Sequence, residues 1–155
     1  MGLDAAGPNY PHVASVVGDD APDCCNVAFW FKLQTDITVV DICGVNGSGS
    51  QLAIAVDSLS RLTATLGGIT YTATTQTIAL DTVYKLELIL KLGTGTAAFE
   101  VRINGLTVDG LQQSGLTSDG GARIVFVAFS RGADAANFHL DHLVFRAGTE
   151  AYSQA

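Results

Sequence analysis

Apolar and polar side chains alternate one by one through the middle of the chain, most regularly in residues 83–110. The leucines of this segment share one parity and most of its charged residues share the other, so a pleated strand would place all the leucines on one face. A Gly-Thr-Gly turn and the Asn104-Gly105 pair, which tolerates the positive φ angles of a two-residue hairpin, separate further alternating runs. The pattern predicts a three-stranded antiparallel meander at the centre of a β-sandwich.

Similar runs elsewhere predict more strands, at residues 13–17, 26–33, 37–43, 51–57, 61–66, 69–74, 77–80, 123–129 and 138–145. The last but one of these runs is almost continuously apolar, which is typical of a strand covered on both faces. Polar, glycine-rich segments predict loops at 44–50, 109–122 and 130–137. No segment predicts a helix of more than a turn or two. About ten or eleven short strands define an all-β protein, an antiparallel β-sandwich or jelly roll.

The composition fits one domain over residues 1–155, with an extended arm at 1–12 and a tail at 146–155. The formal charge of −7 argues against nucleic acid as a partner, because phosphate binding needs clustered Lys and Arg. The first residues show neither the basic region nor the apolar run of a signal peptide. No apolar run has the length of a membrane span, so membrane insertion is not expected.

The chain has three cysteines, which cannot all pair with one another. Cys24 and Cys25 are adjacent, so a disulfide between them would be strained. Buried thiols are the favoured interpretation, and a bridge from Cys43 to either neighbour is the alternative. Without a nearby histidine, the pair does not predict a zinc site.

Four stretches, in this order, resemble the concanavalin A-like lectin/glucanase superfamily and, within it, laminin-G-like jelly roll domains. They are AFWFKL, LAIAVDSLSRLTATLGG, the pair VYKLELILKL and FEVRINGLTVDG, and HLDHLVF. The resemblance implies two curved antiparallel sheets packed face to face, with the first and last strands side by side. It does not by itself imply a function, because this fold hosts lectins, hydrolases and adhesion modules.

Catalytic residues are sparse. The hydrolases of the superfamily carry a Glu-x-Asp-x-x-Glu strand, which this chain lacks, and retaining hydrolysis needs two carboxylates about 5 Å apart. Glu87 and Glu100 are instead expected to be surface carboxylates beside Lys85, Lys91 and Arg102. There is no Gly-x-Ser-x-Gly elbow for Ser-His-Asp chemistry, and the histidines beside Asp141 are expected to be structural. The sequence therefore predicts that the protein is not an enzyme.

A structural calcium ion is a candidate cofactor. Asp141 shares the parity of the apolar residues that follow it, so it is expected to face inward and to need donors or a cation. The resemblance implies that an Asp at this place helps to bind calcium together with oxygen atoms of the N-terminal region. Asp4 or the cluster around Asp19, which includes Asp20 and Asp23, would supply further oxygen ligands. The alternative is a hydrogen bond from backbone N–H groups or a histidine.

Glycan binding would use polar residues of the predicted loops together with aromatic rings. The loop candidates are Asn46, Gln112, Gln113, Arg131, Asp134 and Asn137. The loops carry no aromatic residue, and the expected role of Trp30 is core or inter-strand packing. A lectin or carbohydrate-binding module is therefore the second hypothesis.

The favoured hypothesis is a non-enzymatic structural, decoration or adhesion protein on the surface of a virion such as a phage. The implied fold is usually found outside cells, whereas the sequence shows no export signal, and a virion protein reconciles the two. Its partners would be protein subunits of an assembly, with a homo-oligomer expected, and a cell-surface glycan as an alternative. A glycan-active enzyme is the third hypothesis.

Overall fold

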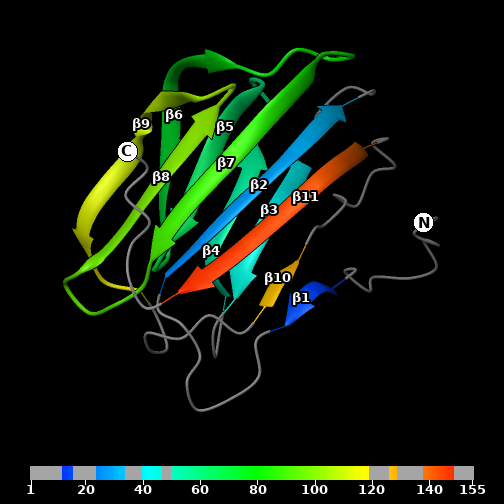
Figure 1. The fold of residues 1–155 in the computed structure, drawn as a ribbon. Helices are drawn as coiled ribbons and strands as arrows, with labels where there is room; N and C mark the ends of the chain where they lie inside the picture. The colour runs from blue at the N-terminus through cyan, green and yellow to red at the C-terminus, as the bar shows by residue number, and fades with distance from the viewer. Residues whose placement is uncertain are drawn as a thin grey trace.

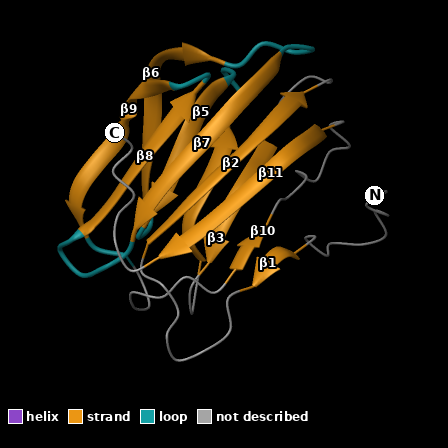
Figure 2. Cartoon of the chain, viewed as in Figure 1, coloured by secondary structure: helices purple, strands orange, loops and turns teal. Residues whose placement is uncertain are grey.

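In the computed structural model, the backbone is described for residues 12–15, 24–33, 40–46, 50–118, 126–128 and 138–148. Side chains are described at 24–33, 52–118, 141, 142 and 144. The described residues form eleven strands and no helix, arranged as two stacked sheets (Figures 1 and 2). The predicted all-β antiparallel sandwich is confirmed.

The two sheets contain six and five strands, and every pairing within them is antiparallel. In sheet order, the six-stranded sheet comprises β1 (His12–Ser15), β10 (Phe126–Ala128), β3 (Val40–Asn46), β4 (Ser50–Val56), β5 (Arg61–Leu66) and β6 (Ile69–Thr77). The five-stranded sheet comprises β11 (Phe138–Gly148), β2 (Cys24–Leu33), β7 (Val83–Lys91), β8 (Ala97–Ile103) and β9 (Leu106–Leu116).

The core lies between the sheets and follows from the alternation in the sequence. Along β5, β7 and β8, and along β2 from Val27 onward, buried residues alternate with more exposed ones, so these segments send every second side chain inward. The largest fully buried side chains include Phe29, Phe31, Ile54, Leu62, Leu86, Leu88 and Leu90. Because both sheets contribute, each needs the other to cover its apolar face.

The predicted tight turn at Asn104-Gly105 has the expected backbone, and a second turn, at Gly67-Gly68, has a similar one. Gly67 and Gly68 have φ of 58° and 76°, and Asn104 and Gly105 have φ of 52° and 83°. Positive φ at both central residues matches the right-handed twist of the strands that flank a two-residue hairpin. The Asn104 side chain adds a bond, because its Oδ1 accepts from Lys85 N at 2.9 Å.

One edge of the sandwich is closed where β6 and β9 meet. A Cβ atom placed on Gly110 would lie 2.7 Å from the carbonyl oxygen of Thr72, so only glycine fits there. Gly110 also has φ of 88°, which glycine adopts without steric cost. The Thr74 hydroxyl donates to the Asp109 carboxylate across the same seam. The two sheets therefore touch directly at this edge.

The structure corrects four details of the predicted arrangement. The separate strand predicted at 77–80 is not formed, because β6 ends at Thr77 and residues 78–80 lie outside any strand. The polar segment predicted as a loop at 109–122 belongs to β9 as far as Leu116, and β3 extends into the predicted loop at 44–50. The last strand, β11, pairs with β2, whereas the first strand, β1, pairs with β10, so the first and last strands are not neighbours.

The thiols of Cys24 and Cys25 are buried, as predicted. Burial, with a smaller contribution from the neighbouring Cys24, raises the pKa of Cys25 to about 12, so this thiol stays protonated at neutral pH. The side chain of Cys43 lies outside the described residues, and so does the alternative bridge.

Candidate functional site

The outer face of the five-stranded sheet carries the only tryptophan of the chain. Trp30 lies between two fully buried phenylalanines on β2, so alternation turns its indole away from the core. Its side chain is 41% exposed. Of the two expected roles of Trp30, core packing was therefore wrong, whereas inter-strand packing stays a prediction. Its parity along β2 was the signal that could have shown this.

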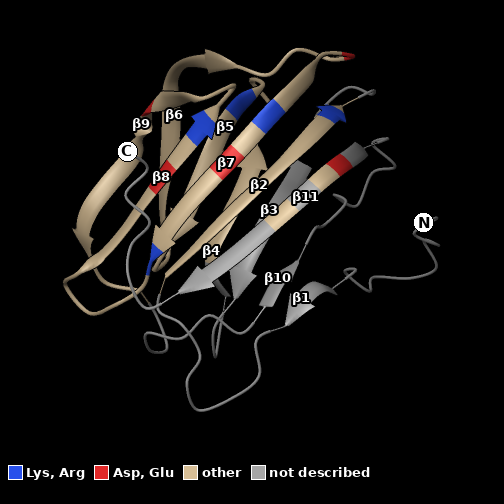
Figure 3. Ribbon diagram, viewed as in Figure 1, with Lys and Arg blue, Asp and Glu red and all other residues tan. Residues whose placement is uncertain are grey.

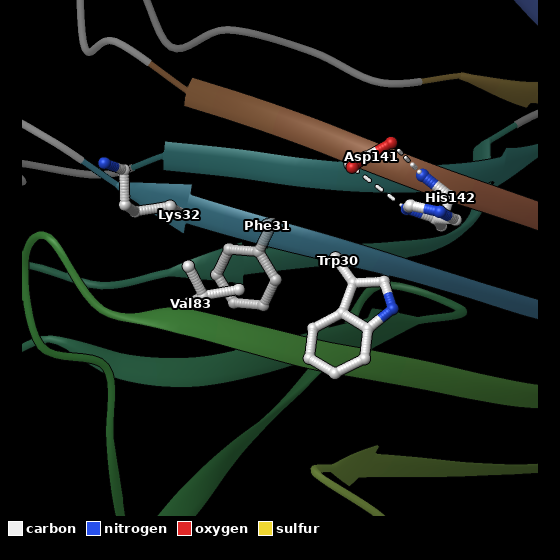
Figure 4. A pocket seen from close by; sticks show the side chains of 6 residues that line it. All are labelled: Trp30, Phe31, Lys32, Val83, Asp141 and His142. Carbon is white, nitrogen blue, oxygen red and sulfur yellow. Dashed lines mark hydrogen bonds and ion pairs between the residues drawn. The ribbon is translucent and has the colours of Figure 1, made fainter.

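Trp30 borders an open depression of about 580 Å³, drawn in Figure 4. Six residues line it, and we call them the Trp30 site: Trp30, Phe31, Lys32, Val83, Asp141 and His142. They come from three neighbouring strands, β2, β7 and β11 (Figure 4). The site thus combines an aromatic ring and an apolar side chain with a cation, a carboxylate and an imidazole.

The loop between β6 and β7 is docked against the end of β2, and this positions one side of the Trp30 site. Asp81 N donates to Leu33 O at 2.7 Å, and Asp81 has φ of 54°. The ammonium of Lys32 lies 3.9 Å from the Asp81 carboxylate. Val83, which follows the loop, is 55% exposed and pairs with Lys32 in the β2–β7 ladder.

A β-bulge positions the other side of the site. Asp141 pairs with Trp30, but Val144, three residues later, pairs with Ala28, two residues back along β2. The extra residue changes which side chains face outward. Asp141 and Val144 have opposite parity, yet both are exposed. The prediction that Asp141 faces inward was therefore wrong, because it assumed an unbroken alternation.

The bulge also forms an Asp-His pair at the surface. His142 has φ of 50°, an unusual value for a residue with a side chain. The Asp141 carboxylate accepts from His142 N at 2.7 Å and lies 2.9 Å from His142 Nδ1. Figure 4 shows the two side chains joined in this way on β11. Contact through Nδ1 leaves Nε2 available to a ligand.

Further ion pairs extend across the same face on β7 and β8. Lys85 Nζ lies 2.8 Å from Glu87 Oε1, and Arg102 Nε lies 2.6 Å from Glu100 Oε1. The Thr107 hydroxyl donates to the same oxygen of Glu100 at 2.5 Å. Hydrogen bonding by Arg102 lowers the pKa of Glu100, although burial opposes this shift, and the carboxylate in turn raises the pKa of Arg102. Both carboxylates thus lie beside the basic residues that the sequence suggested.

The residues predicted for glycan binding lie apart from the Trp30 site or outside the described side chains. Gln112 and Gln113 belong to β9 rather than to a loop, and Gln113 Nε2 donates to Gly110 O at 3.3 Å. Asn46 ends β3, and its side chain is not described. Three further candidates lie outside the described residues, namely Arg131, Asp134 and Asn137.

The predicted calcium site is not assembled within the described part of the chain. There, no group of three or more His, Cys, Asp and Glu side chains is placed to hold a metal ion. Asp141 is 76% exposed and contacts His142. Asp4 and Asp19 lie outside the described residues. A structural calcium ion stays a prediction.

The sequence matches no protein-family model and no curated protein. The fold does resemble solved structures. A double mutant of alginate lyase Aly36B in complex with an alginate trisaccharide aligns with a TM-score of 0.62 at 16% identity, over 82% of this chain and 71% of that one. Alginate lyase AlgAT5 from Polysaccharide Lyase family 7 aligns with a TM-score of 0.58 at 13% identity, over 81% and 59%.

Trypanosoma rangeli sialidase in complex with sialic acid aligns with a TM-score of 0.57 at 11% identity, over 79% of this chain. The chain spans only 20% of the length of that sialidase. At these identities the likeness shows the fold, a β-sandwich jelly roll, and not the activity.

The comparisons also overturn the favoured functional hypothesis. These structural neighbours are named as alginate lyases and a sialidase, which are enzymes. The prediction of a virion decoration or adhesion protein was therefore wrong, and so was the prediction that the protein is not an enzyme. The non-enzyme prediction rested on the absence of two catalytic motifs, and the virion hypothesis on a fold usually found outside cells in a sequence without an export signal. Neither observation tests other carbohydrate chemistry. Within the described residues, no helix has the length and apolar character needed to cross a bilayer.

Proposed function

We propose that the protein recognises carbohydrate through the Trp30 site. The observation that carries this proposal is the exposed indole of Trp30 in an open depression beside hydrogen-bonding and charged side chains. An aromatic face covers the apolar face of a sugar ring, and the surrounding polar groups bind its hydroxyls. The similarity of the fold to carbohydrate-active proteins supports the same class of ligand. We include in this proposal the resemblance of the sequence to laminin-G-like jelly roll domains.

Each residue of the site has a role in this proposal. Val83 extends the apolar surface beside Trp30. Lys32 offers up to three N–H donors on a flexible stem, and its distance of 3.9 Å from Asp81 leaves it able to reach a ligand. Asp141 fixes the imidazole of His142, whose other nitrogen faces no partner from the described side chains.

Trp30 itself reports on binding, because it is the only tryptophan in the chain. We expect its fluorescence to change on titration with at least one of alginate oligosaccharides, sialyllactose and β-glucan oligosaccharides. Trp30→Ala should weaken binding at least about tenfold, as expected for loss of a stacking platform worth more than about 1.4 kcal/mol. Binding by the variant is measured by calorimetry.

Leu106→Ala is the matched control, because Leu106 is also apolar and is 75% exposed, but lies at the β8–β9 turn outside the Trp30 site. This variant should bind as the unmodified protein does. Equal affinity of all three proteins for a bound glycan, or no binding of any glycan in the panel, would overturn the proposal.

A second candidate function is β-elimination on an acidic polysaccharide, and the Asp141–His142 pair favours it. A base that is held by a carboxylate is a recurrent catalytic arrangement. His142 Nε2 would take the proton from the carbon next to the sugar carboxylate, while Lys32 offsets the charge that develops on that carboxylate. A carbon–carbon double bond forms, the glycosidic carbon–oxygen bond breaks, and solvent protonates the leaving oxygen.

Binding ranks ahead of elimination because His142 and Asp141 are 74% and 76% exposed, so the base would work in water rather than in an excluded site. The ultraviolet absorbance of the unsaturated product tests the activity. His142→Gln should abolish any such signal while leaving binding largely intact. An equal rate of product formation by this variant would exclude His142 as the base.

A further inference from the structure

A second group of polar side chains shares the outer face with the Trp30 site, and the strand register fixes its place. Trp30 pairs with Lys85 across the β2–β7 ladder, and Glu87 pairs with Arg102 across the β7–β8 ladder. Lys85 and Glu87 alternate with the core leucines of β7, and Trp30 and Arg102 lie directly opposite them on the neighbouring strands, so all four lie on one face. Figure 3 shows charged positions on β2, β7, β8 and β11 of this sheet.

The second group is centred on Arg102 and is held rigidly. The guanidinium makes two bonds to Glu100, at 2.6 Å from Nε and 3.1 Å from Nη2. Thr107, from β9, donates to the same carboxylate. A fork with two parallel bonds fixes the orientation of both side chains. Side-chain exposures of 21% and 15% leave Arg102 and Glu100 partly open to solvent. Gln112, exposed on β9, pairs with Glu100.

The distance between the two groups determines what could touch both. One strand, β7, separates β2 from β8, so Trp30 and Arg102 are two strand spacings apart, about 10 Å. Their partners on β7, Lys85 and Glu87, are two residues apart, which adds an offset of about 7 Å along the strand direction. The separation is therefore roughly 12 Å, more than one sugar ring can bridge.

Charge on this face differs from that of the whole chain. Of the described lysine and arginine side chains, Arg61 lies on the other sheet, and four lie on this face: Lys32, Lys85, Lys91 and Arg102. Four carboxylates accompany them there, those of Glu87, Glu100 and Asp141 and, beside Lys32, that of Asp81. Cations and carboxylates are therefore equal in number among these described side chains, whereas the chain as a whole carries a charge of −7. An anionic ligand would therefore meet less repulsion here than the overall charge suggests.

We infer that the ligand is a linear acidic polysaccharide that runs diagonally across β7, from the Trp30 site to a second subsite at Arg102, Glu100 and Thr107. This inference rests on the proposed function and adds the length and the charge of the ligand. The first subsite stacks one sugar on Trp30. The second subsite binds hydroxyl and carboxylate groups of a sugar further along the polysaccharide, through N–H groups of Arg102.

Chain length tests the inference directly. Alginate disaccharide, tetrasaccharide and hexasaccharide are titrated by calorimetry, with cellohexaose as the neutral control. We expect affinity to rise at least about tenfold from the disaccharide to the hexasaccharide, because the longer ligand reaches both subsites. Cellohexaose should bind more weakly than the alginate hexasaccharide, and the affinity for the acidic ligand should fall as salt is added.

Arg102→Lys separates the two subsites, because it keeps the charge and removes the two-bonded fork. It should lower affinity for the hexasaccharide about tenfold and leave the disaccharide unchanged. Arg61→Lys is the matched control, since Arg61 is ion-paired with Asp57 at 2.7 Å on the other sheet. Thr107→Val repeats the test without touching Arg102, and a thermal unfolding scan checks that each variant folds.

The outcomes distinguish this inference from the proposed function. Binding that depends on Trp30 but is equal for the disaccharide and the hexasaccharide overturns the second subsite and keeps the proposed function. Equal binding of cellohexaose overturns the acidic ligand. Absence of binding by any saccharide overturns both.

Discussion

The two outer faces of the sandwich differ although the inner faces obey the same rule. On the six-stranded sheet, the outward positions of β5 and β6 are mostly threonines, which pair across the strands as Thr63 with Thr72 and Thr65 with Thr70. Their hydroxyls are satisfied within the sheet: Thr65 Oγ1 and Thr70 Oγ1 lie 2.8 Å apart, and Thr63 Oγ1 donates to Ala55 O at 3.4 Å. Among the described outward side chains of β4, β5 and β6, the charged one is Arg61, which pairs with Asp57.

The five-stranded sheet instead presents an indole, an imidazole and several charges that keep donors and acceptors for a ligand. Alternation requires only that every second residue be apolar, and it leaves the outward residues free to differ. The comparison shows that the core and the candidate site are encoded in alternate positions of the same strands.

The largest loss of stability is expected from a mutation in the core, on which both outer faces depend. Leu88→Ala removes a fully buried side chain of β7 that lies between the sheets. We expect a loss of about 2 to 5 kcal/mol in the free energy of unfolding. Denaturant unfolding should show one transition, with Trp30 fluorescence and far-ultraviolet circular dichroism coinciding. Two separate transitions would show that the faces do not depend on one core.

A smaller loss of stability is expected when one aspartate on each sheet is replaced, and the two losses should differ. Asp57 is 21% exposed and accepts hydrogen bonds from Leu59 N and from Arg61 N and Nε, all at 2.9 Å. Asp57→Ala should cost about 1 to 2 kcal/mol, because the turn loses its anchor. Asp141→Ala should cost less than about 0.5 kcal/mol, since exposed pairs contribute little. Thermal unfolding of the two variants measures the difference, and a reversed order would contradict this account of the two faces.

The smallest effect concerns pH. The pKa of Glu100 is lowered in the folded state, chiefly by Arg102, so its contribution to stability is present above the ordinary value of 4.5 and is lost as the pH falls through the lower, folded pKa. We expect the melting temperature to fall below about pH 4.5 and to fall less steeply in Glu100→Gln. The difference should correspond to about 1 kcal/mol or less, because the pair is partly exposed.

Asp57 should add to the same acid sensitivity from the other sheet. Burial opposes the shift, but hydrogen bonds from Arg61 and Leu59 lower its pKa overall. Identical pH profiles for Glu100→Gln and the unmodified protein would show that the Glu100–Arg102 pair contributes nothing to stability.

The regular strands could be predicted from the sequence because their information is local. The bounds of β5, the parity of β7 and β8, and the two positive-φ turns follow from neighbouring residues alone. In contrast, β9 from residue 109 onward was predicted as a loop, since its glycines and glutamines carry no strand signal. It is a strand because β8 offers it an edge to pair with, with shifts in register along the way. Pairing of this kind is not encoded within the segment itself.

The candidate site was missed for related reasons. Trp30 was assigned to core or inter-strand packing by residue type, although its position between two inward phenylalanines indicates the outer face. The error at Asp141 had a different origin, because a single inserted residue in β11 reverses the parity after it. Such a bulge depends on the partner strand and on the Asp141–His142 contacts, so no period in the sequence reveals it.

The glycine at position 110 has a practical consequence for protein engineering. Since even a methyl group there would collide with the Thr72 carbonyl, the β6–β9 edge has no room for a side chain at this position. The hairpin at Gly95 offers the opposite situation, because an added atom there would meet nothing within 4 Å. Foreign epitopes or fusion partners are therefore best grafted at that hairpin, where they would extend into open solvent.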